Sequence, residues 1–283
     1  MWFKEILKGE WHVHSNGYTF GFAAAIAITC SLLLSVLYTN LKPLQDKNVD
    51  TFVKKNILKV SGVDVTPTTD IQKVFEERLE LKFVDIQGNF VDLNDADTKR
   101  YRNFVKEFKN VGLKRNVVNT DLTAAKDLKL PLYLKKDNSG NVERYIIPVH
   151  GMGLWSLLEG YLALESDLNT VAGITFYEQK ETAGLGAEVQ AAWFPANFPG
   201  KKIYDDAGKL VGVIVKKGVV DKSVAYENTH MVDGISGATI TGNGVSEFLL
   251  KDLTLYEPAF KKILGSKKTE SVSADATTTE AVN

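Results

Sequence analysis

Residues 233–245 read Asp-Gly-Ile-Ser-Gly-Ala-Thr-Ile-Thr-Gly-Asn-Gly-Val. Glycine, alanine and serine leave the backbone bare around Thr239, so a bulky, charged group could approach its hydroxyl closely. A helix is predicted to follow, because apolar side chains then recur at helical spacing. These are Val245, Phe248, Leu249 and Leu253. The first free N–H groups and the positive dipole end of that helix would lie beside Thr239, which predicts an anion site there.

Two interpretations of this turn compete. Ser and Thr are common helix starters, so residues 236–239 could be an ordinary N-cap turn. The string from Asp233 to Thr239, however, resembles the signature of FMN-binding domains in which a flavin transferase joins FMN to the threonine through a phosphoester bond. The resemblance implies Thr239 as the acceptor, with Thr241 as the less favoured alternative. It also implies that the turn around the phosphate is built from Ser236, Gly237 and Ala238.

The composition excludes several classes of function. The 283 residues carry a formal charge of −1 and are 44% hydrophobic, which argues against nucleic-acid binding. The single cysteine, Cys30, can form neither an intrachain disulfide nor a cysteine-built iron–sulfur or zinc site within this chain. The histidines show no ligand pattern and are interpreted as surface or hydrogen-bonded residues: His12, His14, His150 and His230. With no metal site predicted, redox chemistry would need an organic cofactor.

The N-terminal part predicts a membrane anchor. Residues 17–41 contain no Asp, Glu, Lys or Arg, and as a helix they would extend roughly 37 Å, enough for a hydrocarbon core of about 30 Å. A cleavable signal peptide is the alternative, but the apolar run is too long and residues 38–40 are not a small-residue cleavage site. Cys30 would be an apolar filler or, less favoured, a contact with another subunit. Lysines before and after the span, counted alone, would leave the large domain in the cytoplasm.

The rest of the chain predicts an α+β soluble domain with an antiparallel or mixed sheet and flanking helices. Its first part, residues 42–130, is expected to hold helices over 47–61 and after an N-cap at Thr69, then a hairpin of 82–86 with 90–93. The second part, 131–264, has the texture of short strands separated by glycines. Strands are expected at 132–134, 145–147, 160–164, 171–177 and 210–215. The polar residues 265–283 have no apolar period and are expected to be disordered.

Three further stretches contain the residue types that a flavin requires, namely an apolar slot, hydrogen-bond donors and a positive charge. They are 148–155, 181–188 with an expected helix over 187–197, and 216–218. The predicted ring contacts are Met152, Leu154, Trp155 and Leu185; the predicted donors are Thr182, Gly184 and Gly186; the predicted counter-charge is Lys216 or Lys217. Each also has a structural explanation: Trp155 as core, Lys216 as a solvated charge and the glycines as turns.

Five ordered blocks resemble the C subunit of the Na+-translocating NADH:quinone reductase of bacteria. They are residues 148–155, 160–165, 167–177, 181–188 and 233–245. The N-terminal span, with Ser-Asn-Gly-Tyr-Thr before it and Leu-Lys-Pro after it, fits the same type of chain. Two features depart from the family: Ala183 stands where its Glu-Thr-Pro-Gly-Leu-Gly turn has proline, and the polar tail is an addition. Losing a proline loosens the turn but removes no ligand.

The resemblance implies FMN esterified to Thr239, residues 1–16 in the cytoplasm and a soluble domain on the periplasmic side of the bacterial inner membrane. It further implies a one-electron relay from a membrane iron–sulfur centre to the FMN of the B subunit, and then to riboflavin and ubiquinone. The implied partners are the A, B, D, E and F subunits, membrane lipid and a flavin transferase. Asp233 is expected to be a recognition or metal-contact residue for that transferase during attachment. NADH oxidation and sodium passage would belong to the partners, because this chain has neither a dinucleotide fingerprint nor a charge within its membrane span. No catalytic acid or base is expected.

Two alternative functions also fit the sequence. The flavin-carrying component of a related ferredoxin:NAD+ reductase complex has a similar motif, although the blocks within 148–188 match the sodium-pump family better. A membrane-anchored FMN-binding sensor or assembly module belongs to another class of function. A sensor would be expected to carry an output domain, and the residues after Leu264 are too few for one.

Overall fold

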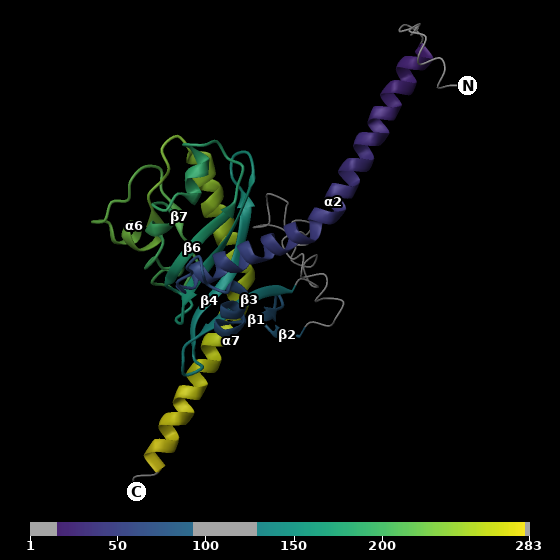
Figure 1. Ribbon diagram of the computed structural model, residues 1–283. Coiled ribbons are helices and arrows are strands. Elements are labelled where there is room, and N and C mark those ends of the chain that lie inside the picture. Colours follow the sequence, from purple (N-terminus) through teal and green to yellow (C-terminus); the bar gives the residue numbers. More distant parts are fainter. Residues whose placement is uncertain (1–15, 93–128, 281–283) are drawn as a thin grey trace. The chain divides into compact units, whose positions relative to one another are not determined.

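The computed structural model describes residues 16–92 and 129–280, with side chains up to residue 267, in two compact units divided between Phe52 and Val53 (Figure 1). Almost all of the expected N-terminal segment 1–16, with His12 and His14, lies outside the described residues, as do residues 93–128. The expected α+β class is confirmed: one long apolar helix is followed by an antiparallel sheet with flanking helices.

Helix α2 (Asn16–Val60) is longer than the sequence predicts. We expected a membrane helix over 17–41 and a separate helix over 47–61, but a single helix runs through Pro43. A proline removes one backbone hydrogen bond, and the apolar residues on both sides keep helical spacing, so the helix continues. Its N-terminal half contains the one candidate membrane span among the described residues, and that span is not buried within the protein. The predicted stop is confirmed, because Gly62 follows at a φ of 75° and its N–H donates to Lys59 O.

A short helix and a hairpin come next. Helix α3 (Ile71–Arg78) begins one residue later than predicted: Asp70 accepts a hydrogen bond from the N–H of Lys73, so Asp70 and not Thr69 is the N-cap. Strands β1 (Leu79–Val84) and β2 (Phe90–Val91) then form the expected hairpin. Its turn contains Gly88 at a φ of 80°.

The sheet has the strand order β2-β1-β3-β4-β5-β6, and all its neighbouring strands are antiparallel. The expected strands at 132–134, 145–147, 160–164 and 171–177 are confirmed and longer than predicted. They are β3 (Leu130–Lys136), β4 (Val142–Met152), β5 (Leu157–Glu165) and β6 (Val171–Glu178). The expected strand at 210–215 shortens to β7 (Ile214–Val215), which pairs in parallel with β8 (Met231–Val232) after helix α6 (Ala225–His230).

The helix expected over 187–197 is wrong. Two short 3₁₀ helices occur instead, η4 (Gly186–Gln190) and η5 (Pro195–Asn197). Pro195 lacks the N–H that a continuous helix would need there. The rings of Phe194 and Phe198 are fully buried and pack edge to face, and this packing holds the irregular segment in place.

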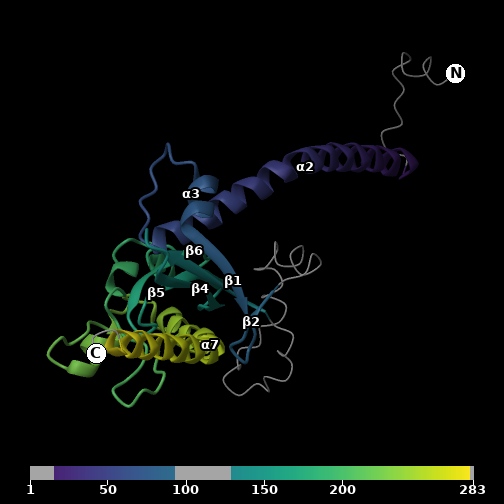
Figure 2. The same cartoon turned by 90° about the horizontal axis from the view of Figure 1, so that it is seen from below.

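Helix α7 (Thr239–Glu280) follows the glycine turn as predicted. It covers one face of the sheet, whereas α3 and the last turns of α2 lie on the other face (Figure 2). Residues 265–280 were expected to be disordered, but they continue α7, because neither glycine nor proline interrupts the chain after Gly265.

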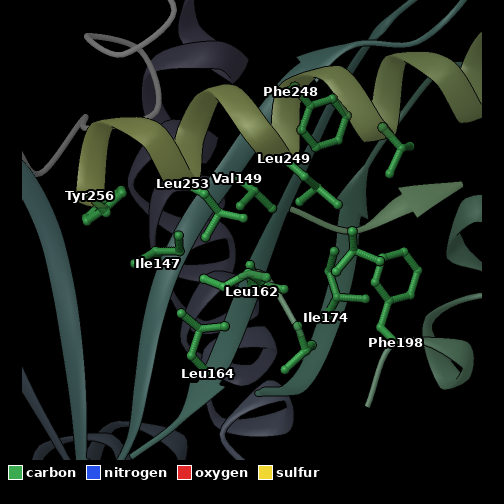
Figure 3. Packing of buried hydrophobic residues seen from close by; sticks show 14 of the residues in the cluster. Ile147, Val149, Leu162, Leu164, Ile174, Phe198, Phe248, Leu249, Leu253 and Tyr256 are labelled. Atoms are coloured by element: carbon green, nitrogen blue, oxygen red, sulfur yellow. The ribbon is translucent and has the colours of Figure 1, made fainter. Parts of the chain in front are cut away.

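The core lies between the sheet and α7 (Figure 3). Strand alternation directs Ile147 and Leu162 toward the helix, where Leu249 and Leu253 are fully buried against them. Ile146, one residue from Ile147, faces the other way, toward the end of α2. Both faces of the central strands are therefore covered, which fixes the carboxyl end of β4 against the first turns of α7.

Candidate functional site

The turn before α7 exposes one threonine and buries another. The N–H of Ala238 donates to Ile235 O at 3.0 Å, and the N–H of Gly242 donates to Ala238 O at 3.0 Å, so the helix starts at Thr239. Helix geometry leaves the first N–H groups of α7 without intrahelical acceptors. Thr239 is exposed at this end, whereas Thr241 is 1% exposed. Only the first hydroxyl is accessible to an incoming group.

Three glycine-containing segments that are distant in sequence meet at this helix end. A Cβ added at Gly244 in α7 would lie 2.2 Å from Met152 O at the end of β4. A Cβ at Gly237 would lie 2.7 Å from Leu185 Cδ2, and Gly237 already has a φ of 74°. The structure thus brings together the stretches 148–155, 181–188 and 233–245, all three of which the sequence predicts to contact a flavin.

A buried carboxylate joins these segments. Glu181 Oε1 accepts hydrogen bonds from the N–H of Trp155 at 3.0 Å and from the N–H and hydroxyl of Ser156 at 2.8 and 2.9 Å. Its Oε2 accepts from the N–H of Leu154 at 3.2 Å and from the hydroxyl of Thr241 at 2.9 Å. Burial by itself raises the pKa of Glu181, but the hydrogen bonds from Trp155, Ser156 and Thr241 outweigh it and hold that pKa below its ordinary value. The carboxylate therefore remains ionised at neutral pH.

Sequence reasoning missed this role. In the sequence Glu181 is only the first residue of a glycine turn, and an acid next to a turn is ordinarily solvated. Its partners lie 25 to 60 residues away in the sequence, so no local pattern connects them to it. The sequence shows glycine at 153 and 186, but only the structure shows that a Cβ at either position would collide with the Glu181 side chain.

Three of the four predicted ring contacts lie at the surface of this site, whereas Met152 is half-buried. Trp155 is 71% exposed, and Leu154 and Leu185 are 37% and 41% exposed. The competing interpretation of Trp155 as a core residue is therefore wrong. Large apolar side chains at a surface commonly mark a binding region.

The predicted donors occupy the turn beside those side chains. Thr182 and Gly184 are exposed, whereas Gly186 is buried. Thr182 O accepts from the N–H groups of Leu185 and Ala187, both at 3.1 Å, and this closes the turn. A Cβ at Gly184 would meet nothing within 4 Å, so open space adjoins this part of the backbone.

The predicted counter-charge already has a partner. Lys216 forms an ion pair with Glu227, and this cation is the main cause that lowers the pKa of Glu227. The neighbouring Lys217 is exposed. Lys216 would have to share its charge with Glu227 if it also faced a phosphate.

Asp233 has a structural contact. Its Oδ1 accepts a hydrogen bond from the N–H of Val220 at 2.7 Å, and the next residue, Gly234, donates its N–H to Gly218 O at 2.7 Å. A Cβ at Gly234 would lie 2.1 Å from Lys216 O. Residues 216–220 are therefore fixed against the start of the motif.

A second buried acid, Asp252, connects α7 to strand β4. Asp252 is fully buried, and its Oδ2 accepts from the N–H of His150 in β4 at 2.7 Å. Lys251 Nζ lies 3.3 Å from Oδ1 of the same carboxylate. Burial raises the pKa of Asp252 to about 6, against the opposing effects of Lys251 and His150. His230 is also buried, and its ring contacts Lys202 O at 2.8 Å, as expected of a hydrogen-bonded histidine.

Asp252 predicts a pH-dependent stability. Its pKa rises from 3.8 to about 6 on folding, so the folded chain retains a proton that the unfolded chain releases. Its stabilising contribution is complete below about pH 3.8 and is lost as the pH rises through about 6. In urea unfolding between pH 4 and pH 8, we expect the stability of the wild type relative to Asp252→Asn to fall by about 2 kcal/mol. A difference that does not change with pH would contradict this.

Metal-ligand side chains do not gather in the described parts of the chain: no group of three or more His, Cys, Asp or Glu residues suited to a metal ion occurs there.

Comparisons with known proteins agree with the geometry. Residues 153–253 match the family model described as FMN-binding domain. The C subunit of the Na(+)-translocating NADH-quinone reductase of Vibrio campbellii is 36% identical over 244 residues, covering 83% of this chain and 90% of that protein. The corresponding protein of Haemophilus ducreyi is 34% identical, covering 78% of this chain and 82% of its own length.

Similar solved structures include the following two. The crystal structure of the corresponding protein from Parabacteroides distasonis has a TM-score of 0.59 and 31% identity, and the match covers 78% of this chain and 96% of that one. Shewanella oneidensis NqrC has a TM-score of 0.63 at 24% identity, covering 75% and 96%, and supports the fold.

Proposed function

The chain belongs to the family of C subunits of the Na+-translocating NADH-quinone reductases and contains an FMN-binding domain, and on this premise we propose that it carries FMN esterified to Thr239 and relays electrons within that complex. The observation that carries the proposal is the contrast between the two threonines. Thr239 is exposed at the first turn of α7, whereas Thr241 is buried and donates its hydroxyl to Glu181. A transferase can reach the first hydroxyl without unfolding the helix.

The residues around Thr239 fit a tethered flavin. The N–H groups and the positive dipole end of α7 favour a phosphate next to Thr239. Trp155, Leu154 and Leu185 offer apolar surface for a ring, and the small residues Ser236, Gly237 and Ala238 let the phosphate approach the backbone. Thr182 and the N–H groups of the turn containing Gly184 and Gly186 supply donors, with Lys216 as the nearby cation. When bound, FMN supplies one-electron redox chemistry.

The residues of this chain would bind the flavin and orient it. An ester bond keeps the cofactor attached while its charge changes, and electron transfer asks no side chain to hold or move a proton. We therefore assign no catalytic acid or base. Helix α2 would anchor the chain in the inner membrane with the soluble domain in the periplasm, where a flavin transferase could act on it.

The proposed partners are the A, B, D, E and F subunits of the complex. Electrons would come from a membrane-embedded iron–sulfur centre and pass to the FMN of the B subunit, then to riboflavin and ubiquinone, while sodium export and NADH oxidation take place in the partners. This chain would act as a part of that enzyme and would not be a complete enzyme by itself.

One experiment tests attachment and relay together. The full chain is produced with and without a flavin transferase and analysed by intact mass, and the transferase-treated chain is then assembled with its partner subunits for quinone-reductase assays. We expect the mass of FMN, less one water, to appear only with the transferase, and we expect quinone reduction only in complexes with the loaded chain. A chain that gains no flavin would refute the proposal, and an unloaded chain that supports full activity would refute the relay.

Asp233 has a narrower test within the same assay. We propose that the transferase contacts its carboxylate during attachment, although Asp233 also accepts the N–H of Val220. Glutamine or alanine would disturb that hydrogen bond, whereas Asp233→Asn retains an acceptor oxygen and removes the charge. Flavin loading should fall in Asp233→Asn, and loading equal to that of the wild type would rule out the contact.

A further inference from the structure

We propose that Glu181 is a positioning residue of the flavin site: its carboxylate holds the turn after β4 and the first turn of α7 in fixed relation, and so orients Trp155 against the cofactor on Thr239. This inference rests on the proposed function and adds to it a role for a residue whose carboxylate is hydrogen-bonded to other parts of the same chain.

The carboxylate of Glu181 accepts an unusually large number of hydrogen bonds. Five hydrogen bonds between 2.8 and 3.2 Å reach the two carboxylate oxygens, and each comes from an N–H or O–H donor. Three of the donors are consecutive backbone N–H groups, those of Leu154, Trp155 and Ser156. A carboxylate is acceptor-only and can receive about four such bonds or more, so its chemistry matches this donor set.

The Glu181 side chain is also confined sterically. Glu181 is only 9% exposed, and its side chain occupies the space that Cβ atoms at Gly153 and Gly186 would take. Ser156 further restricts the carboxylate, because its Oγ accepts from the N–H of Lys180 at 2.8 Å and so has its own hydrogen left for Glu181. The carboxylate is therefore enclosed by the turn that contains Gly153 and by the turn that contains Gly186.

The residues that donate hydrogen bonds to Glu181 lie next to the proposed attachment point and next to the predicted ring contacts. Thr241 lies two residues after the proposed attachment point, in the same helical turn, and its hydroxyl donates to Oε2. Leu154 and Trp155 are bound through their backbone, which leaves both side chains at the surface. Glu181 thus fixes the backbone beneath the predicted ring contacts and the backbone that carries the ester, without covering either.

The test uses the full chain with two conservative changes at Glu181 and one at its partner. Glu181→Gln can keep the acceptor facing Trp155 and Ser156, but its NH₂ group would then face the N–H of Leu154, and the charge is lost. Glu181→Asp keeps the charge on a shorter side chain, and Thr241→Val removes one donor. Glu188→Gln is the matched control, since Glu188 lies in the same stretch but accepts from Trp193 Nε1 at 3.1 Å.

Two readouts are measured. In the chain made without transferase, hydrogen exchange of residues 153–156 should become at least about tenfold faster in Glu181→Gln, as expected for loss of one charge-assisted hydrogen bond. In the loaded chain, fluorescence anisotropy and visible circular dichroism of the flavin should fall toward the values of free FMN. Thr241→Val should show a smaller loss in the same direction, Glu181→Asp should retain more of both signals than Glu181→Gln, and Glu188→Gln should match the wild type.

The outcomes separate the two proposals. If the wild type gains no flavin mass, the proposed function fails at that step and the inference falls with it. If the wild type is loaded but Glu181→Gln equals it in anisotropy and circular dichroism, only the inference fails. If Glu181→Gln does not fold, Thr241→Val and Glu181→Asp decide, and wild-type flavin signals in both would overturn the inference.

Discussion

Thr239→Ala is expected to abolish covalent flavin completely while the chain remains folded. The side chain of Thr239 is exposed at the start of α7, so replacing it removes the proposed acceptor oxygen without opening the core. Alanine is also a good helix former, so the first turn should remain intact. Intact mass and in-gel flavin fluorescence after denaturation measure the loss, and circular dichroism in the far ultraviolet checks the fold.

Thr241→Val is the matched variant for this experiment. Thr241 is buried and donates to Glu181, so valine should lower the free energy of unfolding by about 1.5–3 kcal/mol but leave the flavin attached. Loaded Thr239→Ala together with unloaded, folded Thr241→Val would identify Thr241 as the acceptor. Loading in both single variants would point to an acceptor elsewhere in the chain.

Gly244→Ala should be among the most damaging small substitutions in the soluble domain. A Cβ there would lie 2.2 Å from Met152 O and 3.4 Å from Gly153 Cα, and both atoms belong to backbone that cannot rotate aside. Helix α7 would have to move away from the end of β4, so we expect a loss of about 2–3 kcal/mol in the free energy of unfolding. Flavin loading should decrease too, because the displaced turn carries Thr239.

The same substitution at Gly265 provides the control. Gly265 lies in the same helix, but a Cβ there would meet nothing within 4 Å. Gly265→Ala should therefore stabilise the chain slightly, by about 0.5–1 kcal/mol, through helix propensity alone. Urea unfolding of both variants measures the two changes in the free energy of unfolding, which should have opposite signs. Equal changes would show that the close approach of α7 to β4 is unimportant.

The sheet was largely predictable because its strands are short apolar runs bounded by glycines. Residues such as Ile146 and Ile147 belong to opposite faces of β4, and an apolar residue at both positions indicates a strand covered on both sides. The segment around Pro195 was wrongly predicted because apolar spacing alone cannot tell a helix from an irregular chain held by buried aromatic rings. Helix α2 was divided wrongly because the uncharged run ends at residue 41, and the end of an apolar run does not by itself end a helix.

The structure brings together stretches that the sequence singles out, but the contacts that connect them were not predictable. The glycine turns and Trp155 were recognisable as stretches of sequence, and the structure brings them together. The hydrogen bonds of Glu181 and the burial of Thr241 depend on contacts between segments 25 to 60 residues apart, which one sequence does not encode locally. The pairing of Lys216 with Glu227 is hidden for the same reason: nothing in the spacing shows which of several acids a lysine will meet.

The long reach of α7 back to β4 has a consequence for biosynthesis. His150 donates to Asp252, 102 residues later, and Tyr256 donates its hydroxyl to Pro131 O, 125 residues earlier. A ribosome releases β3 to β6 long before it releases their partner helix, and the hairpins can pair while the remainder is still being made. The acceptor turn reaches its final geometry only after residues up to about 256 have emerged and docked. Under the proposed function, flavin attachment would therefore be a late step, restricted to chains in which α7 has already packed against the sheet.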